Sequence, residues 1–115
     1  MRIDDYEYGR VVIDGREERN DVILVDGTLH ANWWRDEGHR LQVEDLQPVL
    51  DAEPDLLVVG TGTAGNMRPA SDLDGQLRSH GIELEAMPSP QAVRRYNEVA
   101  RAGDRDVALA IHLTC

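Results

Sequence analysis

Lysine is absent from this sequence of 115 residues, and all 12 of its basic residues are arginine. The 22 acidic residues give the chain a formal net charge of −10. Because a charge this negative repels phosphate backbones, we expect no nucleic-acid partner. An acidic surface can serve solubility alone. The lysine-free, acid-rich composition nevertheless favours a halophilic protein, because a high-salt cytoplasm screens the repulsion between like charges.

Long hydrophobic runs are also missing, and cysteine is nearly so. The longest strongly apolar runs, 56–59 and 107–111, are far shorter than the roughly 20 residues of a membrane helix, so we expect no membrane partner. The charged start, Met1–Asp5, predicts a cytoplasmic protein without a signal peptide. Cys115 is the only cysteine, which excludes an intrachain disulfide. The length predicts one domain, residues 1–115, whose core needs no disulfides.

The first third of the sequence has the pattern of an antiparallel β meander. The segments 10–13, 21–25 and 28–34 are rich in residues that favour strands. Asp-Gly pairs at 14–15 and 26–27 separate them, and such pairs favour tight hairpin turns. We therefore expect these three segments to form one antiparallel unit.

From residue 43 onward, segments with helical spacing of apolar residues alternate with short apolar segments typical of strands. The expected helices lie around Leu46–Leu50, from Ser71 to Gly81 and from Ser89 to Gly103. The expected strands are 56–59, 82–86 and 106–114. The last strand is apolar on both faces, which indicates that it is covered on both sides. This alternation predicts an α/β domain with a mainly parallel central sheet.

One glycine-rich segment, Gly60–Gly65, matches the pattern G-x-G-x-x-G directly after an expected strand. In a dinucleotide site a helix begins at these glycines, but Pro69 delays the next helix to about Ser71. Two alternatives stay open: a tight structural loop that needs positive φ angles, or a loop that binds a small anion or ligand. The candidate ligand residues are Gly60, Thr61, Gly62, Thr63, Arg68 and Arg35.

Thiol, serine and metal chemistry have little support in the sequence. Ser71 and Ser89 are expected to cap helices rather than to act as nucleophiles. His112 and Cys115 are three residues apart in an expected strand, so their side chains should point to opposite faces. No other histidine has the spacing of a zinc ligand relative to them. We therefore predict no catalytic residue, no metal site and no cofactor.

Two adjacent tryptophans form the most suggestive surface feature. Strand alternation puts Trp33 inside and Trp34 outside. An exposed tryptophan beside Arg35 has the composition of an interface hot spot, although another layer could equally cover it. Trp34 and Arg35 are thus the candidate surface for a protein partner. A homodimer also stays open, because exposed antiparallel edges often pair.

Four segments, taken in order along the chain, carry a resemblance to a known family. They are Trp34-Arg35 with Gly38-His39, Leu57–Gly62, Ala92–Asn97 and His112–Cys115. Together they resemble the small Mth-nine-three-eight-like domain family, long described as a domain of unknown function. That family includes an adipogenesis-associated animal protein and a mitochondrial respiratory complex I assembly factor.

The resemblance implies a fold and a class of function. The fold is a single three-layer α/β domain with a mixed central sheet and an additional N-terminal β meander. No catalytic residue can be carried over from the family. By analogy with the assembly factor, the favoured interpretation is a non-enzymatic assembly or protein-interaction module. The alternative is a small-ligand protein or an enzyme that uses the loop Gly60–Gly65.

Overall fold

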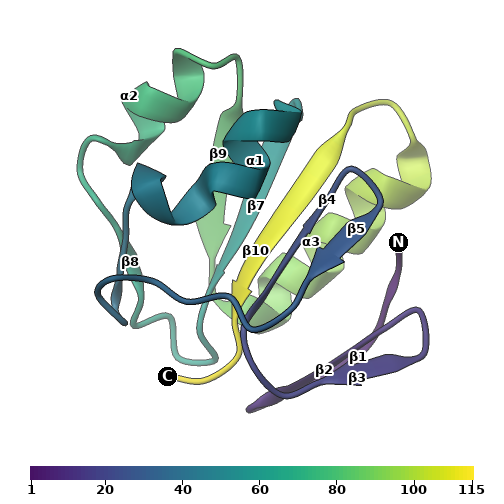
Figure 1. Cartoon of the computed structure of the whole chain (residues 1–115). Helices are drawn as coiled ribbons and strands as arrows, with labels where there is room; N and C mark the ends of the chain where they lie inside the picture. Colours follow the sequence, from purple (N-terminus) through teal and green to yellow (C-terminus); the bar gives the residue numbers. More distant parts are fainter.

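The computed structural model describes residues 1–115 and contains a mixed five-stranded sheet in the order β5-β4-β10-β7-β9 (Figure 1). Strands β10, β7 and β9 run parallel, and β4 pairs antiparallel with β10 and with β5. The strands span Val22–Val25 (β4), Thr28–His30 (β5), Leu56–Thr61 (β7), Glu83–Met87 (β9) and Val107–His112 (β10). The α/β class with a mixed sheet is therefore confirmed.

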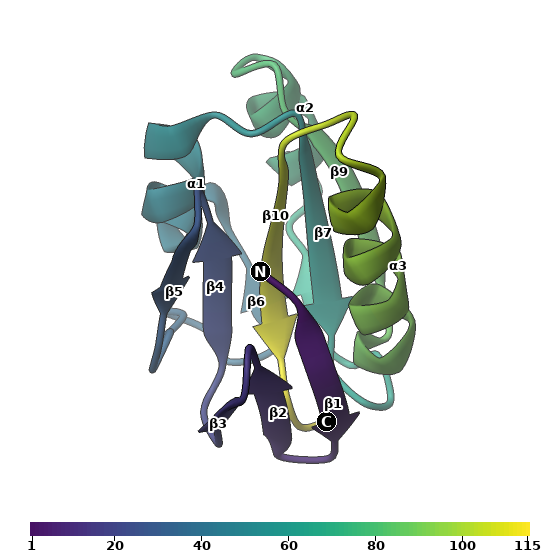
Figure 2. The same cartoon turned by 90° about the vertical axis from the view of Figure 1, so that its right-hand side faces the viewer.

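Helices cover both faces of this sheet, as Figure 2 shows from the side. A 3₁₀ turn at Val43–Leu46 (η1) leads into α1 (Gln47–Ala52), which shares one face with α2 (Leu73–Arg78). Helix α3 (Ser89–Ala102) covers the other face. The two hydrophobic clusters contain 14 and 13 buried residues. The two clusters are almost equal in size, so both faces of the sheet are packed and the sheet is the central layer of three.

The middle strands explain why two layers are needed. Every residue of β7 is buried. Leu57 and Val59 belong to the cluster under α1 and α2, whereas Leu56 and Val58 belong to the cluster under α3. In β10 the residues alternate between the same two clusters. A strand that is apolar on both faces must be covered on both, which confirms that expectation for the last strand.

The N-terminal meander is confirmed, but its strands differ from the expected ones. A separate antiparallel sheet contains β1 (Ile3–Glu7), β2 (Arg10–Ile13) and β3 (Arg16–Glu18). The hairpin β4–β5 belongs to the central sheet instead. Strand β1 has no simple apolar alternation. Tertiary contacts hold it in place, since the Asn97 side chain bonds both the backbone N–H and the C=O of Ile3.

Two expected strands end early, and both endings shape the functional region. Strand β5 stops at His30 because Asn32 adopts a positive φ of 54°. Strand β10 stops at His112, after which the chain turns back toward the loop that follows β7. The short parallel pair β6 (Arg40–Leu41) and β8 (Arg68–Pro69) fastens that loop to the segment before η1.

Both expected serine caps are wrong. Helix α2 begins at Leu73 with Asp72 at the N-cap, and α3 begins with Ser89 inside its first turn. The Ser89 hydroxyl is buried and donates a hydrogen bond of 2.5 Å to the His112 carbonyl. The side chain therefore ties α3 to the end of β10 instead of closing a helix end. None of the helices has the length and apolar character needed to cross a bilayer.

Candidate functional site

The carboxyl ends of β7 and β10 meet three loops at one end of the sheet. The loop after β7 bonds the segment after β10, with Thr63 N–H donating to the Thr114 carbonyl (3.2 Å). The segment between β5 and β6 completes the group, since Arg68 N–H donates to the His39 carbonyl (2.8 Å). Ends of parallel strands are where α/β proteins usually place their sites. All residues singled out from the sequence lie in or near these loops.

The glycines at the end of β7 and in the loop after it allow backbone segments to approach closely. A Cβ at Gly60 would lie 2.8 Å from both Ile111 and Ser89. Gly62 has a φ of 105°, and a Cβ there would collide with the Thr114 carbonyl. Glycine is required at both positions because no side chain fits. This geometry favours the structural-loop alternative.

The amides of this loop are engaged within the protein. Gly62 N–H donates to Ser89 Oγ at 2.9 Å, and Met67 N–H donates to the Thr61 carbonyl at 2.9 Å. Thr63 Oγ1 lies 2.5 Å from the Tyr6 hydroxyl. The next helix, α2, begins only at Leu73, well beyond the loop, so no helix begins at the glycines as a dinucleotide site requires. An anion bound here would have to displace these internal bonds.

Arg35 lies away from the surface on which the sequence had placed it. Its side chain is only 5% exposed and donates to Asp21 Oδ2 at 2.9 Å. Its Nε donates to the Gly38 carbonyl at 3.1 Å, and its guanidinium stacks over the Trp33 ring. Arg35 therefore holds the β5–β6 segment together and does not join Trp34 on the surface. Arg68 is exposed in β8.

Asp21 and His112 form a buried pair at the end of β10. His112 Nδ1 lies 2.8 Å from Asp21 Oδ2, and Asp21 Oδ1 accepts the Leu113 N–H at 2.8 Å. Arg35 Nη2 also lies 3.1 Å from Nδ1, but the Asp21 contact is shorter and a carboxylate only accepts. We therefore assign the Nδ1 proton to the bond with Asp21, which leaves Nε2 with a lone pair. Burial alone would raise the pKa of Asp21. Hydrogen bonds from His112, Leu113 and Arg35 outweigh it and hold that pKa below its usual value.

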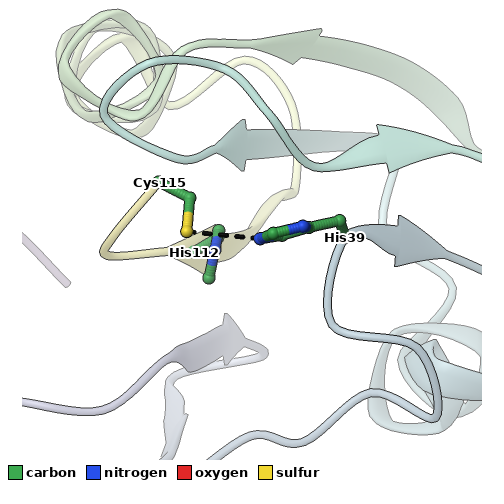
Figure 3. A group of neighbouring side chains, drawn as sticks. All are labelled: His39, His112 and Cys115. Carbon is green, nitrogen blue, oxygen red and sulfur yellow. Dashed lines mark hydrogen bonds between the residues drawn. The ribbon is translucent and has the colours of Figure 1, made fainter.

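His39, His112 and Cys115 come together beside this pair (Figure 3). His39 Nε2 lies 3.2 Å from Cys115 Sγ, and one donor atom of each residue lies within 4.8 Å of the others. The expectation that His112 and Cys115 face opposite ways is wrong. Strand alternation ends at His112, and the chain then bends. No spacing in the sequence indicates that His39 is a ligand. The only earlier signal is that Gly38-His39 is one of the segments that carry the family resemblance.

The two tryptophans lie as expected, one inside and one outside. Trp33 packs against the core and its indole N–H donates to the Asp45 carbonyl at 2.8 Å. Trp34 is 81% exposed, the most exposed large hydrophobic residue of the chain. It lines a pocket of about 250 Å³ together with Asp21, Arg35 and His112.

Comparison with known proteins agrees with this architecture. The family described as "Protein of unknown function (DUF498/DUF598)" matches residues 3–112. A conserved hypothetical protein from Pyrococcus horikoshii is similar at 25% identity and a TM-score of 0.83 over 100% of both chains. A Xanthomonas campestris protein is 27% identical, with a TM-score of 0.78 over 96% of this chain and 83% of that one. A Bordetella pertussis protein titled a Mth938-like domain is 18% identical, with a TM-score of 0.74 over 97% of this chain and 85% of that one, and shares the fold.

Proposed function

This chain belongs to the DUF498/DUF598 family, as the match to residues 3–112 shows, and from the geometry of its surface we propose that it is a non-enzymatic module that binds a protein partner through Trp34. The observation that carries the proposal is the 81% exposure of the Trp34 side chain. An indole left in water on an ordered surface is the kind of anchor that binding hot spots use.

The surroundings of Trp34 hold it ready for a partner. Its neighbours in sequence, Trp33 and Arg35, are both fixed, one by the bond to the Asp45 carbonyl and the other by the ion pair with Asp21. The backbone that carries Trp34 is therefore anchored on both sides. Because this backbone is already ordered, binding costs less backbone conformational entropy, which favours affinity.

The net charge of the molecule favours a basic partner segment. Next to Trp34 the charges are mixed, since exposed Asp36 and Glu37 follow it in the chain and Arg19 and Arg35 line the pocket beside it. The whole molecule carries a net charge of −10, which steers basic partners toward it. The face of an indole also attracts an arginine or lysine side chain by a cation–π interaction. A cationic segment of a protein, with one basic side chain over Trp34, is the occupant we propose.

The size of the adjoining pocket supports a protein segment over a metabolite. Its volume of about 250 Å³ lies below the roughly 300–1,000 Å³ of typical ligand pockets. A single side chain of a partner fits such a volume. The proposed compartment is the cytoplasm, where reducing conditions keep a free thiol such as Cys115 reduced.

The proposal predicts that Trp34→Ala abolishes capture of a specific partner. The immobilised protein is incubated with a cell extract of its source, and the captured protein is purified and titrated against wild type. Trp34→Ala should weaken binding about 30-fold, the loss of about 2 kcal/mol that marks a hot spot. Tyr8→Ala, which removes another exposed aromatic ring, is the matched control and should bind normally.

The same titration tests the charge argument. Affinity should fall as salt rises, since screening weakens the attraction between the acidic surface and a basic segment. If a partner binds Trp34→Ala as tightly as wild type, Trp34 is not part of the binding surface. If binding does not depend on salt, the bound segment is not basic.

A further inference from the structure

We propose that His39, His112 and Cys115 form a binding site for one transition-metal ion, with Zn²⁺ as the ion that fits best. This inference does not depend on the function proposed for Trp34, although His112 also lines the pocket beside that residue. It unites three side chains from three segments: the loop before β6, the end of β10 and the segment after β10. Figure 3 shows the three side chains as neighbours, with the His39 ring pointing toward the sulfur of Cys115.

The strongest evidence is an unsatisfied atom. His112 has a side-chain exposure of 9%, and its Nε2 is the one buried side-chain nitrogen or oxygen without a hydrogen-bond partner. A buried polar group without a partner costs about 1–3 kcal/mol. Such a group calls for an explanation, and an ion ligated by Nε2 supplies one.

The other ring nitrogen is held as a metal ligand requires. Asp21 accepts the Nδ1 proton of His112, so the neutral imidazole keeps its Nε2 lone pair for a metal. A carboxylate behind a metal-binding histidine recurs in zinc proteins, where it fixes the tautomer and orients the ring. Arg35 and the Leu113 N–H bond the same carboxylate and keep it in place. Asp21 is thus a positioning residue for the site.

The donor set and the distances select the kind of ion. Two imidazole nitrogens and a thiolate suit Zn²⁺, whereas Mg²⁺ and Ca²⁺ prefer oxygen ligands. In a tetrahedral zinc site the sulfur and a nitrogen ligand lie about 3.5 Å apart. His39 Nε2 and Cys115 Sγ are already 3.2 Å apart. The three donor atoms all lie within 4.8 Å of one another, close to the ligand separations of such a site.

The exposure of the ligands leaves one coordination position open. His39 is exposed and Cys115 is half-buried, so water reaches an ion at this point. Three protein ligands with a fourth position open to solvent are the arrangement of catalytic rather than structural zinc sites. The ion would therefore accept a small exogenous donor such as water, an anion or a thiolate.

A reactive thiol is the competing explanation for the cluster. His39 and Cys115 alone could form a thiol–imidazole pair, as their contact shows. That pair needs neither His112 nor Asp21, and it leaves the buried Nε2 unexplained. The metal site accounts for all four residues, and for this reason we prefer it.

The test is titration of reduced, metal-free protein with Zn²⁺ and Co²⁺. We expect one ion per chain, and with Co²⁺ a sulfur-to-metal charge-transfer band together with the visible bands of tetrahedral cobalt. Cys115→Ser should abolish the charge-transfer band, and His39→Ala should weaken Zn²⁺ binding by at least about 10-fold. Asp21→Asn should weaken it by about 10–100-fold, as loss of a positioning carboxylate does.

The control variant is His80→Ala, because His80 is exposed and lies outside the cluster. It should bind Zn²⁺ like wild type, and circular dichroism establishes that each variant is folded. Equal binding by His39→Ala, Cys115→Ser and His80→Ala would overturn the proposal, as would the absence of stoichiometric binding. Rapid alkylation of Cys115 that Zn²⁺ does not slow would also overturn it and assign a reactive thiol.

Discussion

Among single residues, Gly62 constrains the functional end of the molecule most tightly. Its φ of 105° is a conformation that other residues rarely adopt, and the Thr114 carbonyl occupies the space of a Cβ. The Gly62 N–H also satisfies the buried Ser89 hydroxyl. The pattern G-x-G-x-x-G thus has a packing cause here: it lets the segment after β10 lie directly on the loop after β7. The position of Cys115 depends on this contact.

Gly62→Ala should therefore destabilise the protein by more than backbone strain alone. The matched control is Gly15→Ala, because Gly15 has a similar φ of 81° but nothing within 4 Å of its Cβ position. We expect about 1–2 kcal/mol for the control and at least about 3 kcal/mol for Gly62→Ala, which adds a collision with backbone. Urea unfolding measures both values. Equal losses would show that the Thr114 contact carries no energy.

Among the elements, α3 does the most to hold the layers together. It packs on β7 and β10 through Ala92, Tyr96 and Val99. Its exposed side bonds neighbouring elements: Arg95 forms a bidentate pair with Glu85 of β9 at 2.8 and 3.1 Å, and Asn97 holds β1. Apolar spacing and Gly103 predicted this helix, and Gly103 ends it with a φ of 74°. The partners of its polar residues lie in distant segments, so no local pattern indicates them.

The pair Glu85–Arg95 makes a small contribution to acid stability. Hydrogen bonds from Arg95 lower the pKa of Glu85 below its usual value, against the opposing effect of burial. A carboxyl whose pKa is lower in the folded state stabilises the fold above its unfolded pKa of about 4.5 and loses this contribution as pH falls. Glu85→Gln should reduce the free energy of unfolding at pH 7 by about 0.5 kcal/mol, since the pair is partly exposed.

Chemical denaturation at pH 7 and at pH 3 measures this difference. The difference in stability between the two proteins should shrink at the lower pH, as Glu85 becomes protonated. Glu44→Gln is a suitable control, because Glu44 is exposed and makes no ion pair. A difference that persists unchanged at pH 3 would contradict the argument.

For the whole molecule, charge is the dominant property. The fold is compact, with a radius of gyration of 12.6 Å, so a net charge of −10 is confined to a small volume. Ion pairs offset part of this repulsion; Arg10 alone bonds Asp5 and Glu17. Twelve arginines cannot neutralise 22 acids. Self-repulsion therefore opposes the compact state in dilute buffer.

Added KCl should raise the melting temperature. We expect a rise of at least about 5 °C between low and molar salt, which corresponds to about 1 kcal/mol for a domain of this size. Differential scanning calorimetry across a KCl series measures it. Comparison with an equal series in a non-ionic osmolyte separates screening from general exclusion effects. A flat response to KCl would contradict both the argument and the halophilic interpretation.

Local patterns in the sequence were sufficient to predict several turns and strands of this protein. Asp14-Gly15 and Asp26-Gly27 form tight turns with positive φ, because their residues tolerate that conformation. The two-sided apolar pattern of 107–111 determined a strand buried on both faces. Each of these depends on neighbours within a few residues, which is where sequence patterns carry information.

The strand order and the set of residues in the site depend on contacts between distant segments. The insertion of β4 beside β10 depends on pairing between segments far apart in the chain. His39 and Cys115 are 76 positions apart, and His112 and Asp21 are 91 apart. These residues come together because of where β10 ends and which loops pack beside it, and no local spacing in the sequence predicts either. Strand alternation failed for His112 and Cys115 because the strand ends between them, and the long-range bonds to the loop after β7 then set the path of the chain.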